Sequence, residues 1–412
     1  MAPPEDAAAA VAWLRTPQAI RARAGLVLAA AERDALTHFA LDEERLDPAA
    51  DYVIETIRTS YPDLAIPYHS RWRHFAVGGH DRWAALAAGL DSDRDEAARA
   101  RFDLVVTSVL LDAGAGEAWR YAEPGSGAVL ARSEGLAIAS LELFRSGALS
   151  SDPARPLRAD AAALVALDER TLGAAFQVTP ANPLVGLGGR CRLLNRLGEA
   201  LLARPAIFGA TAPRIGGLFD HLARQAKDGR LPATKVLAAV LEGLGEIWPG
   251  RIALASVNLG DVGRHPAAAS DDLTSGLVPF HKLSQWLAYS LIEPLEDAGI
   301  SVAGLDQLTA LAEYRNGGLL IDLGVLRPKH AAVLGGAHEG SSEVVVEWRA
   351  LTVALIDRLA ARIRAKLGFS AEELPLAKVL EGGTWAAGRR IAGEKRPGGG
   401  PPLRLVSDGT LF

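Results

Sequence analysis

The feature that most constrains the fold is a helical spacing of apolar residues along most of the chain. The clearest instance lies between Glu343 and Leu367, where apolar side chains recur every three or four residues. Basic side chains, Arg349 among them, occupy the other faces. This spacing predicts one long amphipathic helix. Similar patterns predict a helix that begins at Pro232, and helices at 16–33, 51–60, 96–111, 134–145, 189–203, 214–228 and about 272–297.

Strand signals are few and short. The best are 174–178 and 403–406, each followed by turn residues. The glycines at 186–189 do not form the glycine-rich turn between a strand and a helix that binds dinucleotides. The predicted fold is therefore mainly α and multi-helical, with a few short strands. A linker-like stretch at 146–160 predicts an N-terminal helical region at 1–150, a helical core at 151–394 and a tail at 395–412, with 151–412 forming one domain packed on the first.

The composition excludes several classes of function. The chain has 44 basic and 49 acidic residues, a net charge of −5, which argues against a nucleic acid polymer as partner. Cys191 is the only cysteine, so a disulfide within the chain and a site built on several thiolates are excluded. Its two arginine neighbours predict a lowered thiol pKa. Without a secretory signal or a long apolar run, we expect a cytoplasmic protein with no membrane partner.

Three carboxylates interrupt apolar segments and are candidates for a site. They are Asp112 in SVLLDAGAG, Asp261 in SVNLGDVG and Asp322 in GLLIDLGV. A buried carboxylate must be paired or hydrogen-bonded, so each is either a functional group or a helix cap or ion-pair partner. The glycines at 114 and 116 leave backbone space for a ligand beside Asp112, which makes it the strongest of the three.

A second candidate is the run Glu313, Tyr314, Arg315 and Asn316, between an apolar stretch and two glycines. Around an irregular turn these four side chains would converge on a small polar ligand. The alternative is a capped loop in which the arginine pairs with the glutamate. Lys282, one of only seven lysines, lies among aromatic and apolar neighbours, either in a site or extending along a surface stripe.

A further candidate for anion binding lies later in the chain, with ordinary helix capping as the alternative. Thr384 is a natural N-cap after Gly382 and Gly383, so a helix that starts there would offer backbone N–H groups to a phosphate. The spacing of His69, His74 and His80 does not specify a metal site, and we predict neither a metal nor a cofactor.

Seven long motifs together resemble the uracil catabolism protein 4 family of bacteria and fungi. They are NPLVGLGGR (182–190), VNLGDV (257–262), 276–300, EYRNGGLLIDLGVL (313–326), 346–359, 374–392 and SDGTLF (407–412). The resemblance covers nearly the whole chain. It implies a step in pyrimidine degradation at ribosylurea or its phosphate, with release of urea.

A fainter resemblance links the chain to the queuosine salvage glycosylases. Those proteins have an Asp followed by a Trp seven residues later in one apolar helix, and this chain has Asp112 and Trp119. Their lysine-containing run is similar to 281–285, and their Asp-Tyr-Arg triplet is similar to 313–315, with Glu in place of Asp. The resemblance implies a helical fold like that of helix-hairpin-helix DNA glycosylases, and hydrolysis of an N-glycosidic bond.

Together these resemblances predict an N-ribosyl hydrolase whose substrate is a small ribosyl phosphate. Glu313 is the predicted catalytic carboxylate, beside the anomeric carbon. The predicted substrate-binding residues are Asp112, Trp119, Asp261, His281, Lys282, Tyr314, Arg315, Asn316, Gly383 and Thr384. Two alternatives stay open. The protein is an amidohydrolase that acts on a ring-opened pyrimidine nucleotide, or a non-catalytic partner of the ring-opening enzyme. Association with that enzyme is also open for an active hydrolase.

Overall fold

The computed structural model describes residues 6–88, 90, 93–248 and 252–406 and confirms a mainly α, multi-helical fold with a few short strands. The motif at 407–412 lies outside the described residues. Two compact units divide the described chain. Unit 1 comprises the described residues of 6–69, 252–285 and 304–406, and unit 2 those of 70–248 and 286–303. None of the described helices is long and apolar enough to span a lipid bilayer.

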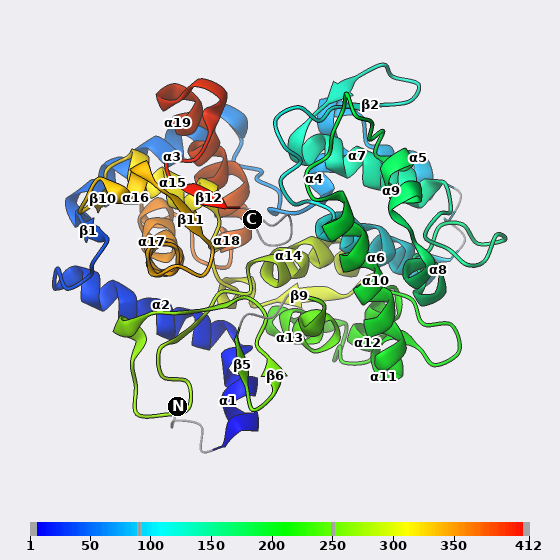
Figure 1. The fold of residues 1–412 in the computed structure, drawn as a ribbon, viewed down its shortest axis with the longest axis horizontal. Helices are drawn as coiled ribbons and strands as arrows, with labels where there is room; N and C mark the ends of the chain where they lie inside the picture. The colour runs from blue at the N-terminus through cyan, green and yellow to red at the C-terminus, as the bar shows by residue number, and fades with distance from the viewer. Residues whose placement is uncertain (1–5, 89, 91–92, 249–251, 407–412) are drawn as a thin grey trace. The chain divides into compact units, whose positions relative to one another are not determined.

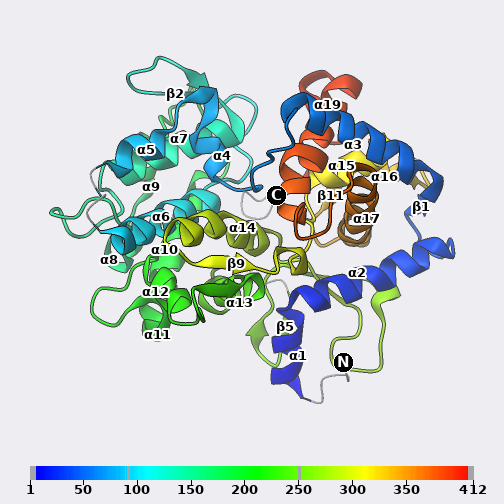
Figure 2. The same cartoon turned by 180° about the vertical axis from the view of Figure 1, so that it is seen from behind.

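Unit 1 is built around one long helix, α17 (Glu343–Leu367), whose bounds are those predicted from the apolar spacing. It contacts α2 and α3, and α15 packs on both α17 and α19 (Figures 1 and 2). Trp348 of α17 is buried and donates from Nε1 to the carbonyl of Gly317 at 3.0 Å. The other helices of the unit are α1 (Ala7–Leu14), α2 (Pro17–Glu32), α3 (Leu46–Ser60), α15 (Tyr314–Asp322), α16 (Ala332–Gly335), α18 (Leu376–Lys378), the π-helical segment η6 (Val379–Trp385) and α19 (Ala386–Lys395).

Unit 2 has a core of helices in which α6 contacts α7, α10 and α12, and α10 also contacts α8 and α13 (Figure 1). Its helices are α4 (Trp72–Phe75), α5 (Arg82–Ala87), α6 (Arg94–Leu110), α7 (Arg132–Arg145), α8 (Ala161–Ala166), α9 (Glu169–Ala175), α10 (Leu187–Ala203), α11 (Pro205–Phe208), α12 (Gly217–Ala223) and α13 (Ala233–Leu244). Helix α14 (Lys282–Asp297) begins in unit 1 and continues in unit 2.

The strands are short and form pairs rather than larger sheets in the described residues. Four pairs are antiparallel: β1 (Phe39–Leu41) with β10 (Leu326–Pro328), β2 (Tyr121–Ala122) with β3 (Val129–Leu130), β5 (Ala253–Leu254) with β6 (Val257–Asn258), and β7 (Val262–Arg264) with β8 (Leu277–Pro279). Two pairs are parallel: β4 (Arg230–Pro232) with β9 (Ser301–Ala303), and β11 (Ala337–Glu339) with β12 (Arg404–Val406).

Several sequence predictions about individual elements need correction. The strand predicted at 174–178 is wrong, because α9 extends to Ala175 and is capped by Asp168, which accepts the N–H of Thr171 at 2.7 Å. The strand predicted at 403–406 is confirmed as β12. The helix predicted from about 272 begins only at Lys282, since β8 precedes it. The predicted domain boundary near 150 falls inside unit 2, where α7 and α9, on either side of it, contact each other.

The prediction of a lowered thiol pKa for Cys191 is also wrong. Its side chain is 3% exposed, and the thiol donates to the carbonyl of Leu167 at 3.3 Å. Burial raises the pKa of this thiol, and Glu169 and Asp168 raise it further, against the opposing effect of Arg192. Cys191 is therefore an inert core residue rather than a nucleophile.

Candidate functional site

Glu313 stands at the start of α15 and is fixed there by its own helix. Its backbone is extended, and its carboxylate accepts two backbone N–H groups, that of Asn316 at 2.6 Å and that of Arg315 at 2.7 Å. A carboxylate at this position satisfies two donors that the helix leaves without partners, and it interacts favourably with the positive end of the helix dipole. Residues 308–312, which precede it and are apolar apart from Thr309, are buried, and this keeps the start of α15 inside unit 1.

The surroundings of Glu313 act on its carboxylate in opposite directions. Burial raises the pKa of Glu313 above its ordinary value of 4.5. The two backbone N–H groups lower it, and electrostatic interactions with Lys282 and His69 lower it further. The charge of Lys282 therefore acts on Glu313 within unit 1, although residues 283–312 separate them in the chain. Such a carboxylate, partly desolvated but held among donors and cations, is typical of functional sites.

Lys282 is the first residue of α14, and Asp261 positions it. The N–H of Lys282 donates to a carboxylate oxygen of Asp261 at 2.9 Å. The preceding residue, His281, has a φ of 47°, the left-handed region that side chains other than glycine seldom adopt. The carbonyl of Asp261 accepts the N–H groups of Phe280 and His281 at 3.0 and 3.2 Å. This network holds the tight turn from which the lysine emerges.

Asp261 forms a buried ion pair with Arg349. The guanidinium binds both carboxylate oxygens, at 2.7 and 2.8 Å, and its Nε donates to the carbonyl of Ala312 at 3.2 Å. Burial would raise the pKa of Asp261, but Arg349 and the N–H of Lys282 lower it to about 2. Arg349 thus connects the anchor of Lys282 to the residue before Glu313. Asp261, predicted to bind substrate, uses its carboxylate for this positioning role.

The imidazole of His281 is buried within unit 1. It is 2% exposed, and Nε2 lies 3.0 Å from the carbonyl of Leu14. Burial lowers the pKa of the ring, so it is neutral near pH 7. This placement supports a structural role, linking α1 to the start of α14, rather than the predicted contact with phosphate.

Tyr314, Arg315 and Asn316 form the first turn of α15, so the irregular turn predicted for this run is wrong. Successive residues of a helix point in different directions. The guanidinium of Arg315 donates to the carbonyl of Gly399 at 2.7 Å and lies 4.9 Å from the ring centre of Tyr314. The amide of Asn316 is buried and donates to the carbonyl of Leu311 at 3.3 Å.

The helix start predicted at Gly383 and Thr384 is also wrong. Residues 376–395 form one continuous helical stretch, in which the π-helical segment η6 contains both residues. Their backbone N–H groups lie inside the stretch, so they are not the free donors that an anion site at a helix start requires. The glycines serve close packing instead, since a Cβ at 383 would lie 3.0 Å from the side chain of Val53 in α3.

His69 and Glu381 form a pair that sequence reasoning missed. His69 Nδ1 lies 2.7 Å from a carboxylate oxygen of Glu381, and the imidazole ring centre is 5.6 Å from that of Trp385. The histidine is 5% exposed and acts on the pKa of Glu313. A π-helical insertion shifts the register of a helix and is frequent at functional sites, and here it carries Glu381 and Trp385.

Asp112 and Trp119 belong to unit 2, whereas Glu313 belongs to unit 1. Both follow the end of α6 rather than sharing one helix, as the glycosylase pattern implies. Asp112 forms an ion pair with the buried Arg71 at 2.8 Å. Trp119 is fully buried and donates to the carbonyl of Phe176 at 2.9 Å. Their contact with a substrate stays a prediction.

Comparisons with known proteins place the chain in a family. The family described as "Protein of unknown function (DUF1688)" matches residues 13–412. The chain belongs to this DUF1688 family. It is 40% identical to "Protein urg3" of Schizosaccharomyces pombe over 411 residues, covering 98% of this chain and 99% of that protein. It is 38% identical to "Uracil catabolism protein 4" of Lachancea kluyveri over 408 residues, covering 91% and 92%.

In this member of the DUF1688 family, the candidate site comprises Glu313, Lys282, His69 and Glu381, all in unit 1. Sequence reasoning found the first two. It considered His69 as a metal ligand together with His74 and His80, which belong to unit 2, or as part of a pocket wall at 68–75, and did not pair it with Glu381. A buried imidazole paired with a carboxylate over such a long separation has no signal in the spacing of one sequence.

Proposed function

We propose that this protein is a hydrolase of uracil catabolism that cleaves the N-glycosidic bond of ribosylurea or its 5′-phosphate, releasing urea and ribose or ribose phosphate. The relative from Lachancea kluyveri is named for uracil catabolism, and its similarity extends over nearly the whole of both chains. The observation that carries the proposed chemistry is the carboxylate of Glu313, positioned by two backbone N–H groups and acted on electrostatically by Lys282 and His69.

Cleavage of a ribosyl C–N bond passes through a sugar with oxocarbenium character. A fixed negative charge beside the anomeric carbon stabilises that transition state, and it costs no reorganisation when the charge is already in place. Glu313 meets this requirement in its ionised form and would also orient the attacking water. Its capping bonds leave further lone pairs on both oxygens, because a carboxylate accepts about four hydrogen bonds.

Lys282 is the proposed contact for the 5′-phosphate. Its backbone is anchored through Asp261 and Arg349, and its charge acts on Glu313, so an anion bound by this lysine would lie near the carboxylate. The lysine would offset the repulsion between phosphate and carboxylate. His69, oriented by Glu381, is the candidate for proton transfer to the leaving urea nitrogen.

The test is turnover by the purified full-length chain of ribosylurea and ribosylurea 5′-phosphate, with products identified by mass spectrometry. Glu313→Gln should lower kcat by about 10² to 10⁴, because the developing positive charge loses its counter-charge. Gln offers a single oxygen, so one of the two capping bonds is also lost. Asp168→Asn is the matched control, since it neutralises an exposed capping carboxylate of α9 and should leave turnover unchanged.

Lys282→Met separates phosphate binding from the chemistry of bond cleavage. We expect KM for the phosphorylated substrate to rise at least about tenfold, with little change for the free ribosylurea, because an ammonium–phosphate contact is lost. Full activity of Glu313→Gln would refute the catalytic assignment. Ammonia and carbon dioxide in place of urea would identify an amidohydrolase. Binding of a ring-opening enzyme without any turnover would identify a non-catalytic partner.

A further inference from the structure

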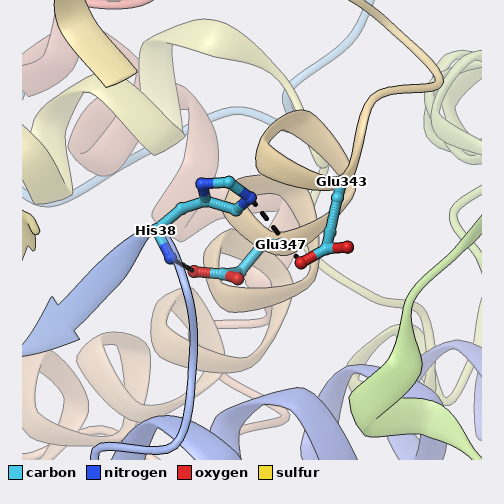
Figure 3. A group of neighbouring side chains, drawn as sticks. All are labelled: His38, Glu343 and Glu347. Carbon is cyan, nitrogen blue, oxygen red and sulfur yellow. Dashed lines mark hydrogen bonds and ion pairs between the residues drawn. The ribbon is translucent and has the colours of Figure 1, made fainter. Parts of the chain in front are cut away.

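A second group of titratable side chains lies in unit 1 and takes no part in the proposed hydrolysis. His38 precedes β1, and Glu343 and Glu347 are one turn apart at the start of α17 (Figure 3). One nitrogen of the histidine and one oxygen of each glutamate lie within 4.8 Å of one another. Imidazole and carboxylate groups at such spacing are the ligands of many divalent metal ions.

Glu347 is the fixed member of this group. Its side chain is fully buried, and one carboxylate oxygen accepts the N–H groups of His38 and Phe39 at 3.1 and 2.8 Å. The other oxygen lies 3.2 Å from Nε2 of the buried His265. In the described part of the chain, Glu347 forms no ion pair with a lysine or an arginine. A buried carboxylate without such a partner is costly unless another cation compensates it.

His38 is oriented by a second histidine. Its Nδ1 lies 3.1 Å from Nε2 of His330. When Nδ1 donates this hydrogen bond, Nε2 keeps a lone pair, which is the tautomer that a metal ligand needs. That Nε2 faces an oxygen of Glu343 at 3.6 Å, too long for a hydrogen bond. With zinc–ligand bonds of about 2.0–2.2 Å, two ligands of one tetrahedral ion lie about 3.4 Å apart.

We propose that His38, Glu343 and Glu347 bind a divalent transition-metal ion of the zinc type, with water completing the coordination. Glu343 is 43% exposed, so the ion can enter from solvent and this side chain can rotate to meet it. His330 would orient His38, and His265 would orient Glu347, through hydrogen bonds of the kind that commonly hold metal ligands in place. The bound ion would tie the start of β1 to the first turn of α17.

The test uses the full-length chain, freed of metal with a chelator and then titrated with zinc chloride in a calorimeter. We expect one zinc ion per chain and a higher melting temperature with zinc. Glu343→Gln should weaken zinc binding at least about tenfold, because it removes a charged ligand. Glu343 is exposed, and among the described residues its ion pair is with His38, so this change should leave the fold intact. His38→Ala should have a similar effect.

Glu339→Gln is the matched control, because it also removes an exposed carboxylate near the start of α17 and should bind zinc like the unchanged protein. Absence of one-to-one binding would overturn the proposal. So would equal zinc affinity in Glu343→Gln and the unchanged chain. If His38→Ala does not fold, Glu343→Gln and the visible absorption of bound cobalt, which reports the ligand set, decide the question.

Discussion

Removal of Arg349 should be far more damaging than removal of a typical arginine of α17. The guanidinium is 6% exposed and binds both oxygens of Asp261. In Arg349→Met, the carboxylate stays buried with one backbone N–H as its remaining donor in this network, that of Lys282. A buried charge that loses its partner typically costs about 3–5 kcal/mol.

The pKa of Asp261 gives an independent magnitude. A lowering from the ordinary value of 3.8 to about 2 makes the ionised form more stable in the folded chain by roughly 2–3 kcal/mol, at about 1.4 kcal/mol per pKa unit. Because this pKa is depressed, the contribution is fully present above about pH 4 and is lost as the pH falls towards 2. In Arg349→Met, burial would instead raise the pKa of Asp261. The cost of the substitution should therefore shrink between pH 7 and pH 4.

Urea unfolding followed by circular dichroism, at pH 7 and pH 4, measures this directly. We expect a loss of about 3–5 kcal/mol for Arg349→Met at pH 7, and a substantial recovery when Asp261→Asn is added, because no buried charge then remains. Arg358→Met is the control on the same helix. Its side chain is 33% exposed and pairs with Glu32 and, at 3.0 Å, with Glu43; because both pairs lie at the surface, its loss should cost under about 1 kcal/mol. A cost below about 1 kcal/mol for Arg349→Met, or strict additivity in the double variant, would refute the reasoning.

Three further predictions concern the carboxylate of Glu313, a helix contact and the thiol of Cys191. The acid limb of the pH dependence of kcat/KM should have its midpoint above 4.5, because the pKa of Glu313 is raised, and a midpoint at or below 4.5 would contradict the assignment. Gly388→Ala should lower the melting temperature and cost about 1–3 kcal/mol of unfolding free energy, because a Cβ there would collide with the carbonyl of Arg315. Gly393→Ala, which places its Cβ in open space, should be neutral or stabilising. Cys191 should resist alkylation at pH 7 until the chain is unfolded, and rapid labelling of the native protein would contradict its burial.

The elements that follow local patterns were predictable. Helix α17 has the predicted bounds because its long apolar spacing leaves little choice of structure. Predictions that depended on one or a few residues were more often wrong. Gly382, Gly383 and Thr384 have the composition of a helix start, yet the chain passes through them as a π-helical segment. The glycines there allow close contact with α3 and residues 61–66, which a local pattern cannot show.

The candidate site shows the same division. Glu313 was found because four polar residues are consecutive in the chain, but its function as the cap of α15 came only from the structure. Arg349 was placed on a polar face by its spacing, whereas the structure buries it against Asp261. The partner in a buried ion pair can be distant in the sequence. In the sequence, a buried arginine such as Arg349 therefore looks the same as an arginine on the surface.

The sequence by itself determined the helical class, the extent of the longest helix and the presence of isolated carboxylates and a rare lysine in apolar surroundings. These properties depend on residues a few positions apart, where backbone geometry repeats. Only the tertiary structure decided which charged and titratable side chains pair: His69 with Glu381, Asp261 with Arg349, and His38 with Glu343. Such pairings depend on desolvation and long-range packing, because the energy of a charge is set by the neighbours that folding brings to it.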